Sequence, residues 1–110
     1  MVKSSQYQSI LKQLTQEWKE RAQYDDLEHH AIIDEQFKHF LVLRTGWIDS
    51  KNYHTTIIHL ELKEDGKVWV HKDNTEWIIV DDLLHAGFTN DQIVLAFHAP
   101  ERRPDTDFAY

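Results

Sequence analysis

Histidine is the residue type that offers most chemistry in this sequence. The chain has eight histidines and no cysteine. His59 and His71 lie on two strand-like segments joined by a short loop, so we expect their rings to face each other across a hairpin. Imidazole binds metal ions and titrates near neutral pH. The spacing supplies no clear third ligand, so we expect a polar sheet face and no metal or cofactor.

A second pattern carries the chemistry of metal-dependent nucleases. Asp49 and Glu61 could hold Mg²⁺, and Lys63, on the same strand face as Glu61, could polarise a phosphate or a water. Isolated Glu-x-Lys pairs are common on solvated strands, however, and this chain is acidic. We therefore keep a metal-dependent nuclease as the alternative hypothesis and expect a protein that is not an enzyme.

Other reaction centres have no sequence support. There is no cysteine nucleophile, no G-x-S-x-G elbow and no phosphate-binding glycine loop. The net charge of −7 opposes a DNA phosphate backbone, and only Arg102 and Arg103 place two cations together. We expect no direct binding to duplex DNA by a monomer, although the arginine tail is where such binding would start.

The elements expected to position these residues form one domain over residues 1–110. Helical spacing of apolar residues predicts a helix over residues 5–23. Strands are predicted over residues 28–34, from Phe40 to near Trp47, over 53–63 and over 67–72, with a bulge or bend at Gly46. The loop Glu64-Asp65-Gly66 predicts a type I turn with Gly66 in the left-handed conformation. This register opposes Leu60 to Val70, Glu61 to Trp69 and His59 to His71.

The second half of the chain predicts a second helix and a return strand. Asn74 or Thr75 is expected to cap the helix, with Glu76 in its first turn and Gly87 after its end. Residues 89–92 read as a capping box, 93–97 as a short buried strand, and 100–110 as an extended tail. The order helix, four strands, helix, strand predicts an α+β fold. We expect an antiparallel sheet of about five strands with two main helices on one face. The sequence does not determine which strand the last one pairs with.

Aromatic and basic residues suggest where partners bind. Trp69 falls on the sheet face opposite Leu60 and Leu62, beside His59, Glu61 and His71. Tryptophan is enriched at interface hot spots, so we expect either a partner-binding face or a surface covered by the tail or by Trp47. The remaining residues predicted to bind partners form a docking tail: Arg102, Arg103 and Phe108. A self-contact here would give a two-fold dimer.

Several segments, in their order and spacing, carry a resemblance to a known family. They are Thr45-Gly46-Trp47, residues 58–63, residues 65–70, Thr75-Glu76, residues 91–100, and the closing Arg103, Thr106, Phe108 and Ala109. Together they resemble the XisI-like family, the excision controlling factors for the fdxN element. The resemblance covers nearly the whole chain.

The resemblance implies an α+β protein of cyanobacteria with no established catalytic residues. It implies an accessory role in the site-specific excision of a DNA element. The implied partners are a site-specific recombinase and a second, nuclease-like accessory factor. The N-terminus lacks a signal-peptide pattern and no apolar run is long enough to span a membrane, so we expect a cytoplasmic protein with no membrane contact.

Overall fold

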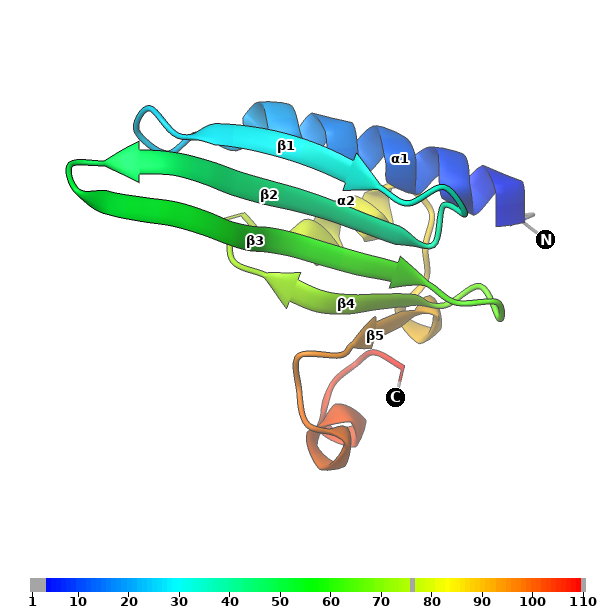
Figure 1. Cartoon of the computed structure of the whole chain (residues 1–110). Helices are drawn as coiled ribbons and strands as arrows, with labels where there is room; N and C mark the ends of the chain where they lie inside the picture. The colour runs from blue at the N-terminus through cyan, green and yellow to red at the C-terminus, as the bar shows by residue number, and fades with distance from the viewer. Residues whose placement is uncertain (1–3, 76, 110) are drawn as a thin grey trace.

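The computed structural model describes residues 4–75 and 77–109 (Figure 1). In chain order its elements are α1 (Ser4–Arg21), β1 (Glu28–Ile33), β2 (His39–Ile48), β3 (Lys51–Leu62), β4 (Val68–Asp73), α2 (Ile79–His85), η1 (Asn90–Gln92), β5 (Ile93–Leu95) and η2 (Pro100–Asp105). This confirms the predicted order of helix, four strands, helix and strand.

The five strands form one sheet in the order β1-β2-β3-β4-β5. The first four pair antiparallel through successive hairpins. β5 instead runs parallel to β4, with Val68 opposite Ile93 and Val70 opposite Leu95. This confirms the predicted antiparallel pairing for β1–β4 and corrects it for β5, whose partner strand was left open, so the sheet is mixed. The physical reason is the crossover through α2, which returns the chain to the starting end of β4.

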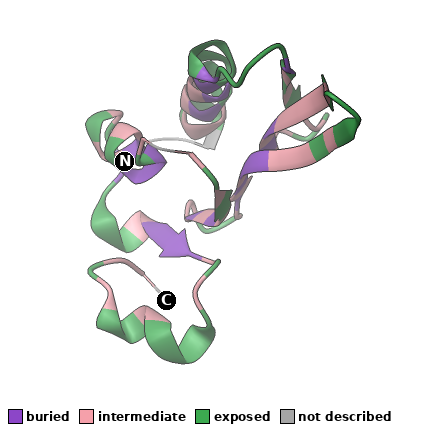
Figure 2. Cartoon of the chain, turned by 90° about the vertical axis from the view of Figure 1, so that its left-hand side faces the viewer, coloured by how far each residue is buried: buried purple, intermediate pink, exposed green. Residues whose placement is uncertain are grey.

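Both main helices pack on the same face of the sheet, behind it in Figure 1 and to one side of it in Figure 2. The core lies between the two layers. Helix side chains such as Trp18 and Leu83 meet strand side chains such as Phe40, Leu60 and Val70, all with no exposed surface. The strand residues at alternate positions leave a second sheet face that the helices do not cover.

The β3–β4 hairpin confirms the predicted loop and most of its register. Lys63 N–H donates to Lys67 O at 2.9 Å, Gly66 N–H donates to Lys63 O at 3.0 Å, and Gly66 has a φ of +86°. Leu62 opposes Val68, Leu60 opposes Val70 and Glu61 opposes Trp69. The loop thus sets which side chains reach the uncovered face.

A bulge or bend was predicted at Gly46, but the bulge of this strand pair lies elsewhere. Gly46 pairs with Tyr53 in regular register, whereas the β2–β3 register shifts between Val42 and Leu43. Gly46 is required for a different reason. A Cβ at this position would lie 2.8 Å from Leu27 Cδ2, and the backbone φ is +133°. A glycine is needed there for the close approach of the chain that enters β1.

The second helix begins later than predicted, at Ile79, so neither Asn74 nor Thr75 is its N-cap. The Thr75 hydroxyl lies within hydrogen-bonding distance of the Asp73 carboxylate and the Trp77 carbonyl instead. Asp73 Oδ2 also accepts from the Ile79 N–H at 3.3 Å, which satisfies a free donor at the helix start. Glu76, expected in the first turn, lies outside the described residues.

The end of the second helix and the capping box agree with the sequence. Gly87, with a φ of +110°, follows the C-cap residue Ala86. Thr89 and Gln92 form the predicted capping box at η1. β5 ends at Leu95, earlier than predicted, because the chain turns there and His98 N–H donates to Leu95 O at 3.1 Å. Figure 2 shows β5 buried along its length.

The tail was predicted to be extended, but it forms the 3-10 helix η2. Pro100 begins this helix, where proline's fixed φ and missing N–H cost nothing. After η2 the chain returns to the sheet, where Ala109 bridges to Val94 and its N–H donates to Ile93 O at 2.8 Å. None of the helices in the described part of the chain has the length and apolar character to cross a membrane.

Candidate functional site

A row of three histidines crosses the uncovered sheet face, which we call the open face. It consists of His39 on β2, His59 on β3 and His71 on β4. His39 Nδ1 and His59 Nε2 share a hydrogen bond of 3.1 Å, and the ring centroids of His59 and His71 are 4.7 Å apart. Only one of two bonded imidazole nitrogens can carry the proton. The His39–His59 pair therefore cannot be doubly protonated in this geometry.

The predicted pairing of His59 with His71 needs a correction. His59 directly opposes Lys72, because β4 contains one extra residue between Val70 and Lys72, and that residue is His71. A bulge of this kind sets two residues of one strand against one residue of the other. The two rings still contact each other. The prediction missed the bulge because the alternating pattern of β4 continues through it.

Glu61 lies beside the histidine row, with its carboxylate within 4.0 Å of both outer histidines, His39 and His71. Its carboxylate accepts from His71 Nε2 at 2.9 Å and lies 3.1 Å from Lys63 Nζ. Burial alone would raise the pKa of Glu61, but the hydrogen bonds from His71 and Lys63 outweigh it and the pKa is lowered. Glu61 is thus an anion at neutral pH, and its partners hold it in a fixed orientation.

His59 lies in the middle of the row and has a different environment. Burial lowers its pKa, and the neighbouring His71 and His39 lower it further, against an opposing effect of Glu61. At neutral pH His59 is therefore uncharged. The open face therefore presents an uncharged imidazole at His59 close to the charged carboxylate of Glu61.

Trp69 lies beside this row, and its indole ring is close to two cations that come from different segments of the chain. Lys63 Nζ is 4.8 Å and the Arg103 guanidinium 5.2 Å from the Trp69 ring. The Arg103 guanidinium also donates to His98 O at 3.1 Å and to Ala96 O at 3.4 Å. The sequence suggested that either the tail or Trp47 could cover Trp69. The tail does contact Trp69, through Arg103, whereas Trp47 lies near the far end of β2. Trp69 remains half-buried.

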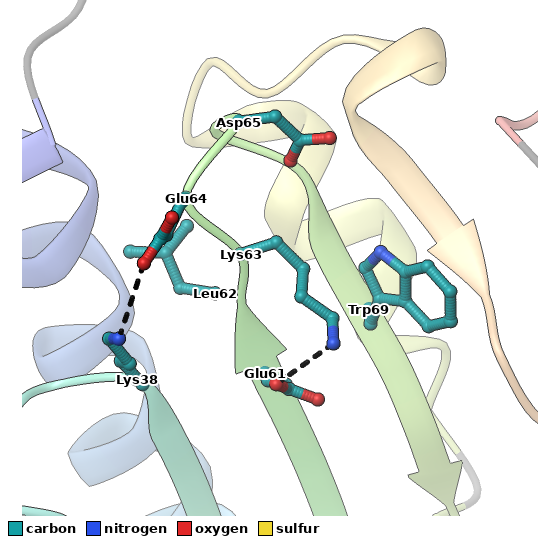
Figure 3. A pocket seen from close by; sticks show the side chains of 7 residues that line it. All are labelled: Lys38, Glu61, Leu62, Lys63, Glu64, Asp65 and Trp69. Carbon is teal, nitrogen blue, oxygen red and sulfur yellow. Dashed lines mark ion pairs between the residues drawn. The ribbon is translucent and has the colours of Figure 1, made fainter.

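A shallow hollow of about 500 Å³ opens between Trp69 and the hairpin loops (Figure 3). Four of its charged side chains form ion pairs, with Lys38 3.8 Å from Glu64 and Lys63 3.1 Å from Glu61, while Asp65 accepts a hydrogen bond from the Lys67 backbone N–H. Figure 3 shows the Lys63 side chain between Glu61 and the Trp69 ring. Paired charges around an indole suit the polar and aromatic groups of a protein surface better than a free anion.

The three residues predicted to form a docking tail have different environments. Arg102 is exposed on η2. Arg103 is half-buried by its contacts with Trp69 and two carbonyls, and Phe108 packs against the hydrophobic core. Arg103 and Phe108 thus hold the tail on the domain, and Arg102 is the exposed one of the three predicted residues.

The structure does not bring the nuclease constellation together. Asp49 lies in the turn before β3, whereas Glu61 lies near the other end of that strand. Lys51 and Glu61 are ten positions apart along the extended strand, which corresponds to roughly 30 Å. Among residues 4–75 and 77–109, no group of three or more His, Asp or Glu side chains has the arrangement to hold a metal ion.

His39 is the member of the site that the sequence did not single out. The strand was predicted to begin one residue later, at Phe40, and its register to β3 was unknown. The alternation of His39 and Leu41 with the buried Phe40 and Val42 was the available signal. It would have placed His39 on the open face, next to His59.

The fold and site define an α+β protein with a mixed five-stranded sheet, helices on one face and a histidine row on the other. The family model described as "XisI protein" matches residues 1–110. The chain therefore belongs to the XisI family, which confirms the resemblance inferred from its sequence.

Solved structures agree with this assignment. The chain is similar to a XisI-like protein from Anabaena variabilis ATCC 29413, with a TM-score of 0.87 and 27% identity over 97% of this chain and 98% of that one. It is also similar to the fdxN element excision controlling factor XisI from the same strain. That comparison gives a TM-score of 0.81 and 32% identity over 96% of each chain. No match was found among curated proteins.

Proposed function

We propose that this chain is an accessory factor for the site-specific excision of a DNA element in the cytoplasm, and that it acts by binding protein partners rather than by catalysis. Membership of the XisI family supports the excision-related role, since a similar member is named an excision controlling factor. The proposed partner is a nuclease-like second accessory factor, a site-specific recombinase, or both.

The observation that carries this proposal is the organised open face. His59, Glu61 and His71 are joined by direct contacts, and Trp69 is held between two cations. Tryptophan and arginine side chains are enriched at the centres of protein interfaces, and side chains that are already held in place lose little entropy on binding. A partner that covers this face would bury the row and the indole together.

Co-purification with the product of a neighbouring nuclease-like gene is the first experiment, followed by titration of the purified pair. Trp69→Ala is expected to weaken binding by at least about tenfold, as truncation of a hot-spot tryptophan does. Trp47→Ala is the matched control, since Trp47 is 65% exposed on the same sheet and lies far from the histidine row. Trp47→Ala should leave the affinity unchanged.

The test also separates binding from a fold defect and from catalysis. Trp69→Phe keeps an aromatic ring beneath Lys63 and Arg103, so it should restore part of the affinity if the ring makes the contact. Equal affinities for wild type, Trp69→Ala and Trp47→Ala would mean that this face is not the interface. Cleavage of plasmid DNA with Mg²⁺ or Mn²⁺ that Glu61→Gln abolishes would replace the proposal with the nuclease alternative.

A further inference from the structure

The two edges of the sheet differ in whether another segment of the chain covers them. At one edge β5 has three residues, and the returning tail covers it through the bridge from Ala109 to Val94. At the other edge β1 has six residues and pairs with β2 alone. An uncovered edge presents unpaired backbone N–H and C=O groups to any extended segment that fits.

Of the features that usually prevent edge pairing, β1 has one charged side chain, the exposed Glu28 at its first position. It contains no proline, lysine or bulge, and its register to β2 is continuous from Glu28 to Ile33. Ile32 is 43% exposed on the open face. The edge is therefore long enough, regular enough and apolar enough to accept another strand.

The backbone groups that point outward can be identified from the hairpin. Asp34 N–H donates to His39 O at 3.3 Å, so this pair bonds toward β2. In an antiparallel ladder bonded and non-bonded pairs alternate, which makes Ile32 and His30 bond toward β2 as well. The outward-facing N–H and C=O groups then belong to His29, Ala31 and Ile33.

We propose that the β1 edges of two copies of this chain pair antiparallel about a two-fold axis at Ala31, which joins the sheets into one of ten strands. In this register Ala31 opposes Ala31 of the second copy, and His29 opposes Ile33 of the second copy. All the outward groups of both strands are then satisfied by six hydrogen bonds. A shift by two residues in either direction would leave some of them unpaired.

Side chains around the axis favour a second copy as the occupant. Ala31 is small and borders a hollow of about 480 Å³ between β1 and α1, which Lys19 and Glu20 also line. The two-fold axis brings Lys19 and Glu20 of both copies around this hollow, where opposite charges can meet. On the open face the exposed Ile32 would lie against His30 of the second copy. An unrelated extended segment would need to supply this complementarity independently.

This edge is distinct from the histidine row, so the inference does not rest on the proposed function. Each copy carries a net charge of −7, so the copies repel at long range. Added salt screens that repulsion, and the dimer is expected to tighten between low and moderate ionic strength.

Sedimentation or light scattering of the wild-type chain should give twice the 13.2 kDa of one chain. Ala31→Pro removes an outward N–H and no bond to β2, a position where an edge strand accepts proline. It should give a folded monomer by circular dichroism, whereas Ala31→Gly, which keeps the N–H, should remain a dimer. A wild-type monomer across the concentration range, or a folded Ala31→Pro dimer, would overturn the proposal.

A cross-linking experiment tests the register and remains valid if Ala31→Pro does not fold. The chain has no cysteine, so single-cysteine variants are clean probes. His30 and Ile32 of the second copy form a non-bonded pair about 4.5 Å apart at Cα, within the range of a disulfide. Two copies of His30 lie roughly 8 Å apart, which is too far.

Under mild oxidation, a mixture of His30→Cys and Ile32→Cys should therefore form the mixed disulfide faster than either variant forms its own. Ser50→Cys, in the exposed β2–β3 turn, gives the rate of chance collisions. A mixed disulfide that forms no faster than this control, or a faster His30→Cys homodimer, would exclude the proposed register.

Discussion

The contact between the two helices gives a quantitative prediction about stability. Trp18 on α1 is fully buried, and its indole Nε1–H donates to Asp82 Oδ2 on α2 at 2.7 Å. Arg21 donates to the same oxygen at 3.0 Å, with its side chain 45% exposed. One carboxylate thus satisfies a buried donor and pairs with a surface cation. Asp82→Ala removes both contacts.

The magnitude follows from the two contacts. A buried N–H left without an acceptor costs about 1–3 kcal/mol, and the exposed pair with Arg21 adds about 0–1 kcal/mol. We expect Asp82→Ala to lower the free energy of unfolding by about 1–4 kcal/mol, a large share for a domain whose total is about 5–15 kcal/mol. Asp82→Asn keeps an oxygen acceptor and should cost about 1 kcal/mol.

Urea unfolding followed by tryptophan fluorescence and by circular dichroism measures these differences. Asp81→Ala is the control, because Asp81 is the exposed neighbour on the same helix turn and should cost no more than about 0.5 kcal/mol. In a Trp18→Phe background Asp82→Ala should cost little more than this control, since the donor is gone. Equal costs for Asp82→Ala and Asp81→Ala in the wild-type background would refute the reasoning.

Three further predictions concern pH, backbone and tail. The pKa of His59 is lowered in the folded state by burial, by His71 and by His39, so the unfolded chain takes up a proton first and stability falls as the pH drops below the ordinary value of 6.5. His59→Gln should reduce that loss in urea titrations at stepped pH, and an unchanged slope would contradict the assignment. Gly46→Ala should cost more in thermal unfolding than Gly87→Ala, because both glycines have positive φ but a Cβ at Gly46 alone meets a side chain, at 2.8 Å. Strain of this kind costs about 1–3 kcal/mol. Equal losses of stability in the two variants would show that the Leu27 side chain moves aside to accommodate the new Cβ. Arg103→Ala removes the tail's bonds to His98 O and Ala96 O and should speed amide exchange around Ala109, while Arg102→Ala should not.

Local signals predicted much of the fold. Gly66 after Glu64-Asp65 determined the hairpin loop, and the alternation around Leu60 and Val70 determined which face is buried. Gly87 marked the end of α2 because a positive φ favours glycine there. These features depend on a few neighbouring residues, so the sequence carries them directly.

The remaining differences arise from contacts between distant parts of the chain. The bulge at His71 leaves no local mark, because the residues on both sides of it still alternate. Asp73 satisfies the start of α2 from six residues away, so no side chain at the usual cap position is needed. The parallel pairing of β5 follows from the path of α2 behind the sheet, and the local pattern of Ile93–Leu95 does not encode that path.

The candidate site was predicted in part for the same reason. His59, Glu61 and Trp69 share one hairpin, so the loop sufficed to place them on one face. His39 and Arg103 lie on the same face, but they belong to segments about 20 or more residues away from this hairpin in sequence. Their positions depend on contacts between distant segments, which the local sequence pattern does not specify.

The connection between β4 and β5 has a consequence for folding kinetics. The first four strands are joined by short turns, so their pairing closes small loops and carries little entropic cost. We expect β5 and the tail to dock after α2 has formed and crossed the sheet, because Val68 and Ile93 lie far apart in sequence. Substitutions along β5 and η2 should therefore accelerate unfolding and leave the refolding rate nearly unchanged, whereas those in the β3–β4 hairpin should slow refolding.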